Sequence, residues 1–391
     1  MRASKTATTL AGTGLALVIL PAIPVAQADD KGFSVGGYVH YDTRDFQQRP
    51  FASTRDTSDV RRVRPVFQYK SPTWSARLMP DLERETNLAL DAYVDITPET
   101  PWDLRIGRFK SPLSMNSQQS SNALVAMENS VVAAMTPNRD NGVLLGFETA
   151  GEASWRFEAA AFDGAADDEV KGSLDGGAEW TLRALRKQPL GSGRLRLAIG
   201  ASGGNREGEP GDARLARGRT PGLETWFRYV GQAYSDGGTS RAIASADWQR
   251  GPWYVQAEAI RSVETVRLAD SRERIGRRGW ELQASHVLTG EDRAVDGVKP
   301  TNLRLPGLDL PMAVEVGARI AEVRVDDEAF DLGFADPATS GERLRSAGVS
   351  VALWFPKQWR LQVDYEHSRI GLREAGDLTE KALMARAIIA F

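Results

Sequence analysis

The sequence contains no cysteine and only three histidines. The absence of cysteine excludes disulfide bonds, thiol catalysis and thiolate metal sites. His40, His286 and His367 lie in separate strand-like segments and lack the close spacing of metal ligands. We therefore expect no metal site and no cofactor, and we expect that the protein is not an enzyme.

Long apolar runs are also absent beyond the N-terminus. No uninterrupted stretch there approaches the roughly 20 apolar residues that a transmembrane helix needs. This excludes a helical membrane protein. A transmembrane β-barrel remains compatible with the sequence, because only alternate residues of each barrel strand face lipid.

The N-terminus has the parts of a secretory signal. A basic start precedes an apolar stretch from Leu10 to Val25, and Ala26-Gln27-Ala28 fits the small-residue cleavage site. Two prolines shorten the apolar stretch, which disfavours a membrane anchor. We expect a signal peptide over residues 1–28 and a single mature domain over residues 29–391.

The C-terminal segment alternates between apolar and more polar positions. Its apolar face consists of Leu383, Ala385, Ala387, Ile389 and the final residue, Phe391, whereas the opposite face carries Arg386. Successive side chains of a β-strand point to opposite faces, so this strand has one lipid-like side and one wetter side. A terminal strand that ends in an aromatic residue is typical of bacterial outer-membrane β-barrels.

The same alternation recurs along the chain, often after a short turn and a tryptophan. Five of the ten tryptophans follow such turns, at positions 74, 102, 155, 253 and 359. Tryptophan prefers the membrane–water boundary, so its repeated placement at strand starts predicts an aromatic girdle. The polar faces mix arginine with acidic residues, which favours a watery barrel interior over a half-buried soluble sheet.

The connections between these segments alternate in length. Short turns are expected near 71–73, 98–101, 150–154, 189–193, 251–252 and 356–358. Long polar loops are expected near 47–58, 110–140, 164–177, 204–221, 265–276, 289–311, 327–342 and 371–377. Outer-membrane barrels have short turns on the periplasmic side and long loops outside. We predict an all-β, antiparallel transmembrane barrel of about 16 strands, wide enough for an aqueous channel.

One long connection, residues 111–138, is less charged than the others. It contains Leu124, Val125, Met127, Val131 and Val132, which fit poorly with a surface loop exposed to water. We expect this third loop to fold inward, to pack against the wall and to narrow the lumen. Its stretch 122–128 is expected to form a helical turn or two.

Several stretches resemble the phosphate-selective porin O and P family, and the match runs over roughly residues 33–391. These stretches are 61–64, 91–93, 105–114, 127–128, 137–143, 283–291 and 315–319. The resemblance implies a sixteen-stranded barrel, a homotrimer, a third loop folded into the pore and passive diffusion of small anions such as phosphate or polyphosphate. It also implies a bacterial outer-membrane location.

The resemblance and the alternation together indicate candidate site residues. Family arginines match Arg61 and Arg62, and family loop serines match Ser120 and Ser121, whereas Asn122 and Asn129 stand where the family carries arginine. By alternation, the inward-facing arginines are Arg62, Arg64, Arg183, Arg194, Arg196, Arg228, Arg319 and Arg386. Arg61 has the opposite parity and faces the lumen only near a bulge or the rim. The candidate constriction residues are Lys110, Ser120, Ser121, Asn122 and Asn129.

Rings of arginine or lysine are the usual device of anion pores, because these side chains attract phosphate oxygens. The opposing interpretation is that the arginines pair with acidic residues across the interior, among them Asp91, Asp95, Glu158, Glu224 and Glu315. The formal net charge of −3 does not exclude an anion pore, since selectivity depends on the local field at the constriction.

Two other functions remain open at this stage. One is a general or otherwise selective porin without tight phosphate specificity, which the two asparagines favour. The other is a barrel enzyme or a non-conducting receptor, for which we find no histidine partner and no plug domain. The expected partners are small anions, outer-membrane lipid and lipopolysaccharide. Acidic outer loops such as 167–169 and 326–328 are expected either to be solvated or to bridge to lipopolysaccharide through divalent cations, and solvation alone is the simpler expectation. No nucleic-acid partner is expected.

Overall fold

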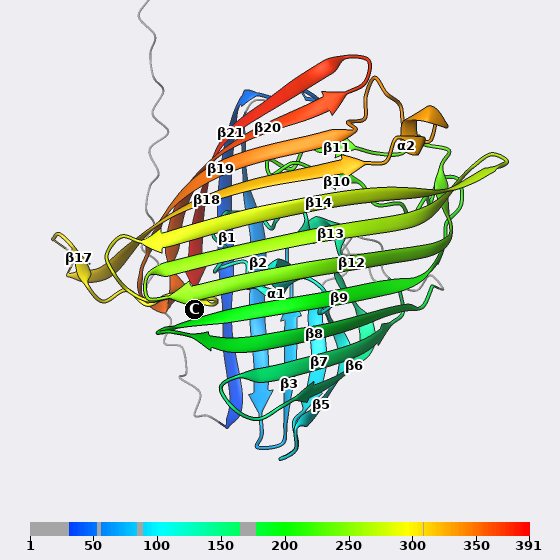
Figure 1. The fold of residues 1–391 in the computed structure, drawn as a ribbon. Helices are drawn as coiled ribbons and strands as arrows, with labels where there is room; N and C mark the ends of the chain where they lie inside the picture. Colours follow the sequence, from blue (N-terminus) through cyan, green and yellow to red (C-terminus); the bar gives the residue numbers. More distant parts are fainter. Residues whose placement is uncertain (1–30, 53–55, 84–88, 165–176, 308) are drawn as a thin grey trace, which may run out of the picture.

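A computed structural model describes residues 31–52, 56–83, 89–164, 177–307 and 309–391. The predicted signal peptide therefore lies outside the described residues. Sixteen antiparallel strands form the wall (Figure 1). They are β1 (Gly32–Gln48), β2 (Asp56–Lys70), β3 (Trp74–Pro80), β4 (Ala89–Ile96), β5 (Trp102–Lys110), β6 (Arg139–Glu148), β7 (Ser154–Phe162), β8 (Glu179–Leu190), β9 (Gly193–Glu207), β12 (Tyr234–Arg250), β13 (Trp253–Leu268), β14 (Ser271–Val287), β18 (Leu310–Val325), β19 (Arg343–Trp354), β20 (Arg360–Leu372) and β21 (Gly376–Ala390).

The wall closes on itself where the last strand meets the first. β21 pairs with both β20 and β1, and the backbone amides of Gly37 and Phe391 each donate to the other's carbonyl at 2.9 Å. A Cβ at Gly37 would lie 2.7 Å from the ring of Phe391, so this contact requires glycine. The short strand β17 (Leu303–Leu305) pairs only with the start of β18. The predicted sixteen-stranded barrel is confirmed.

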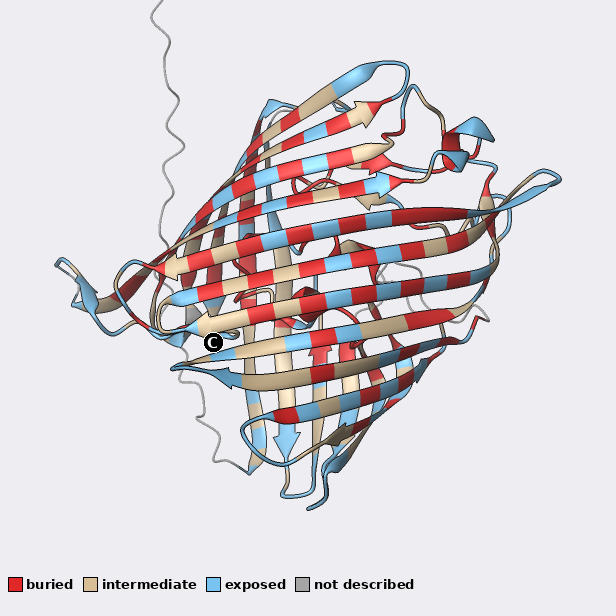
Figure 2. Ribbon diagram, in the orientation of Figure 1, coloured by how far each residue is buried: buried red, intermediate tan, exposed pale blue. Residues whose placement is uncertain are grey.

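Burial alternates along the strands as the sequence pattern predicts (Figure 2). In β21, Leu383 is exposed and Arg386 is buried. Trp74, Trp102 and Trp253 begin strands, Trp155 is the second residue of its strand, and Trp359 directly precedes one. All five follow connections at the same end of the barrel, the end at which most turns are short.

The predicted lengths of two connections are wrong, and so is the predicted end of the barrel for a third. The expected loops at 265–276 and 371–377 are tight turns of residues 269–270 and 373–375, because the flanking strands extend further than their polarity suggests. The connection 288–309 is long as expected, but it lies at the short-turn end. It carries β15 (Arg293–Ala294), β16 (Gly297–Val298) and β17.

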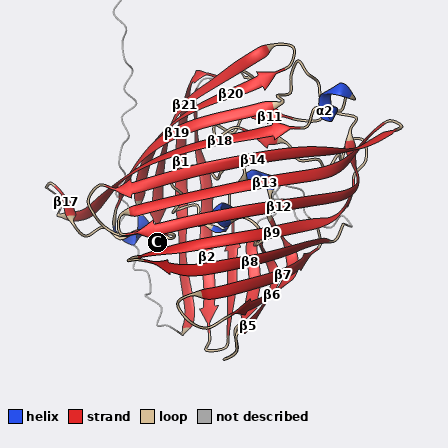
Figure 3. Ribbon diagram, in the orientation of Figure 1, coloured by secondary structure: helices blue, strands red, loops and turns tan. Residues whose placement is uncertain are grey.

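In the described ranges, helix occurs as short pieces in connections (Figure 3). Residues 111–138, hereafter the β5–β6 loop, contain α1 (Met115–Gln118) and the 3-10 turn η1 (Ala133–Met135), whereas the predicted helical stretch 122–128 is irregular. The others are α2 (Glu328–Asp331) and η2 (Pro356–Gln358). Among the described residues, no helix has the length and apolar character needed to cross a membrane.

The β5–β6 loop is buried against the rest of the chain. The apolar residues that the sequence analysis singled out in it are all buried. Val132 and Met135 join an apolar cluster with Trp226 and Phe227 from β11 (Thr225–Phe227), which forms a hairpin with β10 (Gly218–Arg219) in the β9–β12 connection. The β5–β6 loop and the β9–β12 connection, which are distant in sequence, therefore pack together.

Candidate functional site

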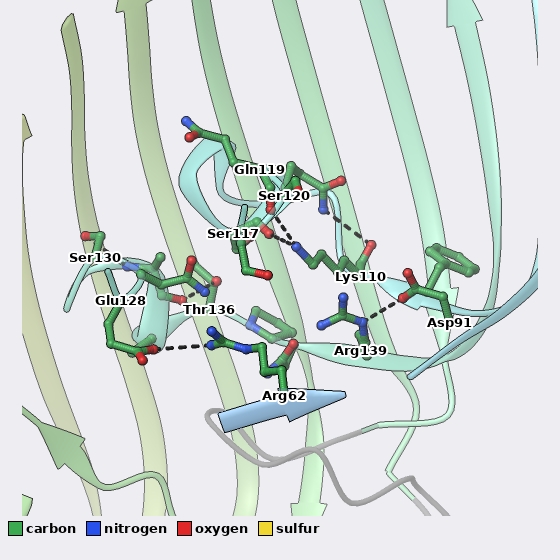
Figure 4. Close-up of a pocket in the computed structure, with 18 of the residues that line it drawn as sticks. Arg62, Asp91, Lys110, Ser117, Gln119, Ser120, Glu128, Ser130, Thr136 and Arg139 are labelled. Atoms are coloured by element: carbon green, nitrogen blue, oxygen red, sulfur yellow. Dashed lines mark hydrogen bonds and ion pairs between the residues drawn. The ribbon is translucent and has the colours of Figure 1, made fainter. Parts of the chain in front are cut away.

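A cavity of about 610 Å³ lies between the wall strands β1–β6, the β5–β6 loop and part of the β9–β12 connection (Figure 4). Among the described residues, nine basic side chains line it, against two carboxylates. The basic residues are Arg61, Arg62, Arg64, Arg77, Arg105, Lys110, Arg139, Arg217 and Arg219, and the acidic ones are Asp91 and Glu128. The cavity therefore has a strong excess of positive charge.

Arg61 and Arg62 both reach Glu128 of the β5–β6 loop. The distances are 3.4 Å for Nε of Arg61 and 3.3 Å for Nη2 of Arg62. Neighbouring residues of a regular strand point to opposite faces, but β2 has a bulge here: His40 pairs with Arg62, and Tyr41 already pairs with Val60. The extra residue lets both arginines face the interior, which is the condition that the sequence analysis set for Arg61.

Glu128 is surrounded by guanidinium groups. Besides Arg61 and Arg62, it lies 2.7 Å from Nη2 of Arg386 and 3.4 Å from Nη2 of Arg44. Burial by itself raises the pKa of Glu128, but Arg62, Arg386, Arg61 and Arg44 outweigh it and hold the pKa well below its usual range. Glu128 is therefore a fixed anion that several arginines share.

The remaining wall arginines of the cavity also share carboxylates. Asp91 lies 2.6 Å from Nε of Arg139 and 3.5 Å from Nε of Arg77. Arg105 makes two bonds to Asp95, at 2.6 and 3.0 Å. Arg64 donates to Asp81 at 2.9 Å and to the hydroxyl of Tyr38 at 3.1 Å. These bonds fix the guanidinium groups at the cavity wall without cancelling its net charge.

Lys110 supplies a cation of a different kind. Its ammonium donates to the carbonyl oxygens of Ser117 and Gln119, at 2.5 and 2.9 Å. Within the described part of the chain it forms no direct ion pair, and its nearest partners are these carbonyl dipoles. Ser120 and Ser121 line the same cavity, and Ser121 donates to the Tyr38 hydroxyl at 3.3 Å.

The two loop asparagines have different surroundings. Asn129 is exposed and lines the cavity. Asn122 is 5% exposed and turns away from it, with Oδ1 2.7 Å from Nε2 of His40. The expectation that Asn122 lines the constriction is therefore wrong, because the wall histidine holds this side chain.

Four other predicted wall arginines face inward but lie outside the cavity. Arg183 and Arg196 pair with Glu158 and Asp247, as the opposing interpretation required. Arg319 bonds Glu366 at 2.8 Å and the carbonyl of Glu128 at 3.0 Å. Arg386 is 2% exposed and binds Asp42 at 2.6 and 2.7 Å, as well as the carbonyl of Met127. The last two hold the β5–β6 loop.

The two other predicted arginines also lie outside the cavity, and of these Arg228 differs from the expectation. Arg194 is exposed at the turn end of β9, outside the cavity. Arg228 was expected on a wall strand, but it is exposed in the β9–β12 connection. The alternating residues next to Arg228 form the short strand β11, which lies outside the barrel sheet. Alternation alone does not distinguish such a strand from a strand of the barrel wall.

A second clamp reaches the β5–β6 loop from the short-turn end. Arg293 donates to Glu315 and to the carbonyl of Ala123, both at 2.6 Å. Arg360 donates to the carbonyl of Leu124 at 2.7 Å. Connection 288–309 thus packs against the loop at Ala123 and against wall residues of β14, β18 and β19.

Sequence reasoning did not select five of the cavity's arginines. Arg77 and Arg105 alternate with the exposed Leu78 and Ile106, so the parity test used elsewhere also assigns them to the interior. Arg139 begins β6 directly after the loop. Arg217 and Arg219 come from an outer connection whose path no local pattern indicates.

The family assignment rests on a sequence match. Residues 33–391 match the family model described as phosphate-selective porin O and P. The chain belongs to this family. It is therefore a porin of the bacterial outer membrane, and its family and fold are those of a channel. No curated protein sequence matches the chain.

Solved structures with the same fold include three outer-membrane proteins of low sequence identity. The porin resembles the outer membrane channel DcaP of Acinetobacter baumannii with a TM-score of 0.58 and 12% identity, covering 92% of this chain and 98% of that one. The anion-selective porin from Comamonas acidovorans matches with a TM-score of 0.53 and 10% identity, covering 92% of this chain and 99% of that one. The trimer form of OmpT from Vibrio cholerae matches with a TM-score of 0.52 and 7% identity, covering 93% of this chain and 100% of that one. These likenesses concern the fold.

Proposed function

We propose that this porin is a passive diffusion channel that favours small anions, and that they pass through the basic cavity. The observation that carries the proposal is the cavity lining, in which the described part of the chain places nine basic side chains against two carboxylates. Arginine suits this task because it stays charged and offers a planar fork of donors that matches phosphate oxygens. The β5–β6 loop forms the constriction in this account.

Rapid passage requires attraction without trapping. Most cavity arginines already share a carboxylate, and the two acidic residues of the lining each serve more than one arginine. An entering anion then competes with a fixed anion for the same donors. This arrangement lowers the barrier for anions and keeps their residence short.

Phosphate is the proposed physiological solute class, on the strength of the family. The alternative is a general porin without tight phosphate specificity. It is favoured by Asn129, an uncharged side chain in the lining, and by Asn122, which is turned away from it. We further propose a homotrimer, the form named for the OmpT structure of the same fold.

Planar-bilayer recording of the refolded protein tests these assignments. Under a KCl gradient, the zero-current potential should have the sign of anion preference, and added phosphate should reduce the chloride current. A cation-selective potential would contradict the proposed function. Anion preference without a phosphate effect would leave the anion channel and reject phosphate as its solute class.

A further inference from the structure

Four arginines form a row across adjacent strands on the outer face of the barrel. The register pairs Arg261 with Arg278, Arg278 with Arg324, and Arg324 with Arg343. Neighbouring strands lie only about 4.8 Å apart, and like charges directly opposite each other are destabilising. The row therefore needs a counter-charge.

The chain supplies little of that counter-charge. Glu322 bonds Arg324 and Arg343. It also bonds Arg345, its direct partner on β19, at 2.9 Å. Within the described residues, Arg261 and Arg278 have no ion pair or hydrogen bond from their side chains, and both are exposed. One carboxylate thus serves three arginines, and two further arginines have none.

A cleft of about 400 Å³ lies at this row. Arg278, Arg324 and Arg343 line it on one side, and the acidic residues Asp326, Asp327, Glu328 and Glu342 lie beside them. Two of these acids are engaged elsewhere, since Arg373 bonds both Asp327 and Glu342. Because Asp326 and Glu328 remain in its lining, the cleft itself does not attract an anion, whereas the outward-facing guanidinium groups of Arg261 and Arg278 do.

The row lies at the border of the apolar band. The next outward residues toward the short-turn end are Trp280, which is 45% exposed, and then Leu282 and Ile320. Tryptophan marks the headgroup level of a membrane. Because the row is at the end with the long loops, this border faces the outer leaflet.

We propose that Arg261, Arg278, Arg324 and Arg343 bind the phosphate groups of a phosphorylated glycolipid of the outer leaflet, which in this membrane is lipopolysaccharide. Guanidinium forks bind phosphate through charge-assisted, often bidentate bonds, and the lipid would neutralise the facing arginines. The inference depends on the outer-membrane location and not on the proposed anion passage. It also differs from the expected contact through acidic loops and divalent cations, since the arginines bind the lipid directly.

The test is a double variant, Arg261→Gln with Arg278→Gln, compared with a matched pair at the opposite end. The control is Arg250→Gln with Arg304→Gln, which removes the same charge from exposed arginines near the short turns. Native mass spectrometry of the refolded, detergent-solubilised protein in EDTA would measure bound lipopolysaccharide. The row variant should bind it at least about tenfold more weakly than the wild type and the control.

Three further arms decide the source of the phosphate and the nature of the contact. Dephosphorylated lipopolysaccharide should bind the wild type as weakly as intact lipid binds the row variant, and inorganic phosphate should not displace the intact lipid. Unchanged affinity of the row variant would overturn the proposal, as would loss of binding in EDTA, which would indicate divalent bridging. Loss of the oligomer with unchanged lipid affinity would overturn it in favour of a protein interface.

Discussion

Nη2 of Arg386 lies 2.7 Å from Oε1 of Glu128, so the last strand of the barrel holds the loop that borders the basic cavity. Arg386 also binds Asp42 on the first strand. The same residue thus joins the two strands that close the barrel and holds the β5–β6 loop. Closure of the wall and the position of the β5–β6 loop are coupled through this side chain.

Replacing Arg386 should loosen the β5–β6 loop. Arg386→Gln removes a buried guanidinium and leaves Asp42 and Glu128 with fewer donors, which costs roughly 3 kcal/mol for a buried pair. We expect a larger and noisier single-channel conductance and faster proteolytic cleavage within the loop. Arg194→Gln, at an exposed wall position outside the cavity, is the control. Equal conductance noise and cleavage rates in both variants would show that Arg386 does not position the loop.

The contribution of Glu128 should depend on pH. Its folded-state pKa lies below the ordinary carboxyl value of about 4.3, so its stabilising contribution is present above that value and is lost as pH falls through the folded pKa. At about pH 7, Glu128→Gln should therefore unfold at a lower temperature than the wild type. The difference in unfolding temperature between the two proteins should decrease as the pH is lowered toward about 3. Thermal unfolding of both proteins across this range is the measurement, and a gap that stays constant would contradict the assignment.

The alternation pattern predicted the barrel and its lipid-facing side chains, because burial in a strand follows a period of two. It failed wherever backbone register departs from that period. The bulge opposite His40 turned Arg61 inward, and the pairing register, not polarity, made residues 269–270 a tight turn. The path of the β5–β6 loop depends on clamps such as Arg293, which come from segments far away in sequence and leave no local signal.

The two loop asparagines should respond differently to replacement by arginine. Asn129→Arg adds a cation to an exposed cavity position and should strengthen block of the chloride current by phosphate. Asn122→Arg forces a larger charged group against His40 in a buried place, so it should lower the unfolding temperature instead. Phosphate titration in bilayers and thermal unfolding measure the two effects. Stronger phosphate block in both variants would contradict the geometry of Asn122.

Connection 288–309 should tolerate alanine at one glycine and not at another. A Cβ at Gly297 would lie 2.8 Å from the Trp354 ring, and its φ is 122°. Gly307 also has a positive φ, of 82°, but an added Cβ there meets no described atom within 4 Å. Gly297→Ala should lower the free energy of unfolding by about 1–3 kcal/mol more than Gly307→Ala, because only the first substitution places a methyl group against the Trp354 ring. Equal unfolding temperatures would show that the contact with Trp354 is unimportant.

The ion selectivity of three proteins tests the account most directly. The zero-current potential under a KCl gradient should indicate anion preference in the wild type. Arg62→Gln with Lys110→Gln, which removes two cations from the cavity lining, should move it toward zero, whereas Arg183→Gln, an inward arginine outside the cavity, should leave it unchanged. A cation-selective wild type, or a cavity variant with unaltered selectivity, would contradict passage of anions through this cavity.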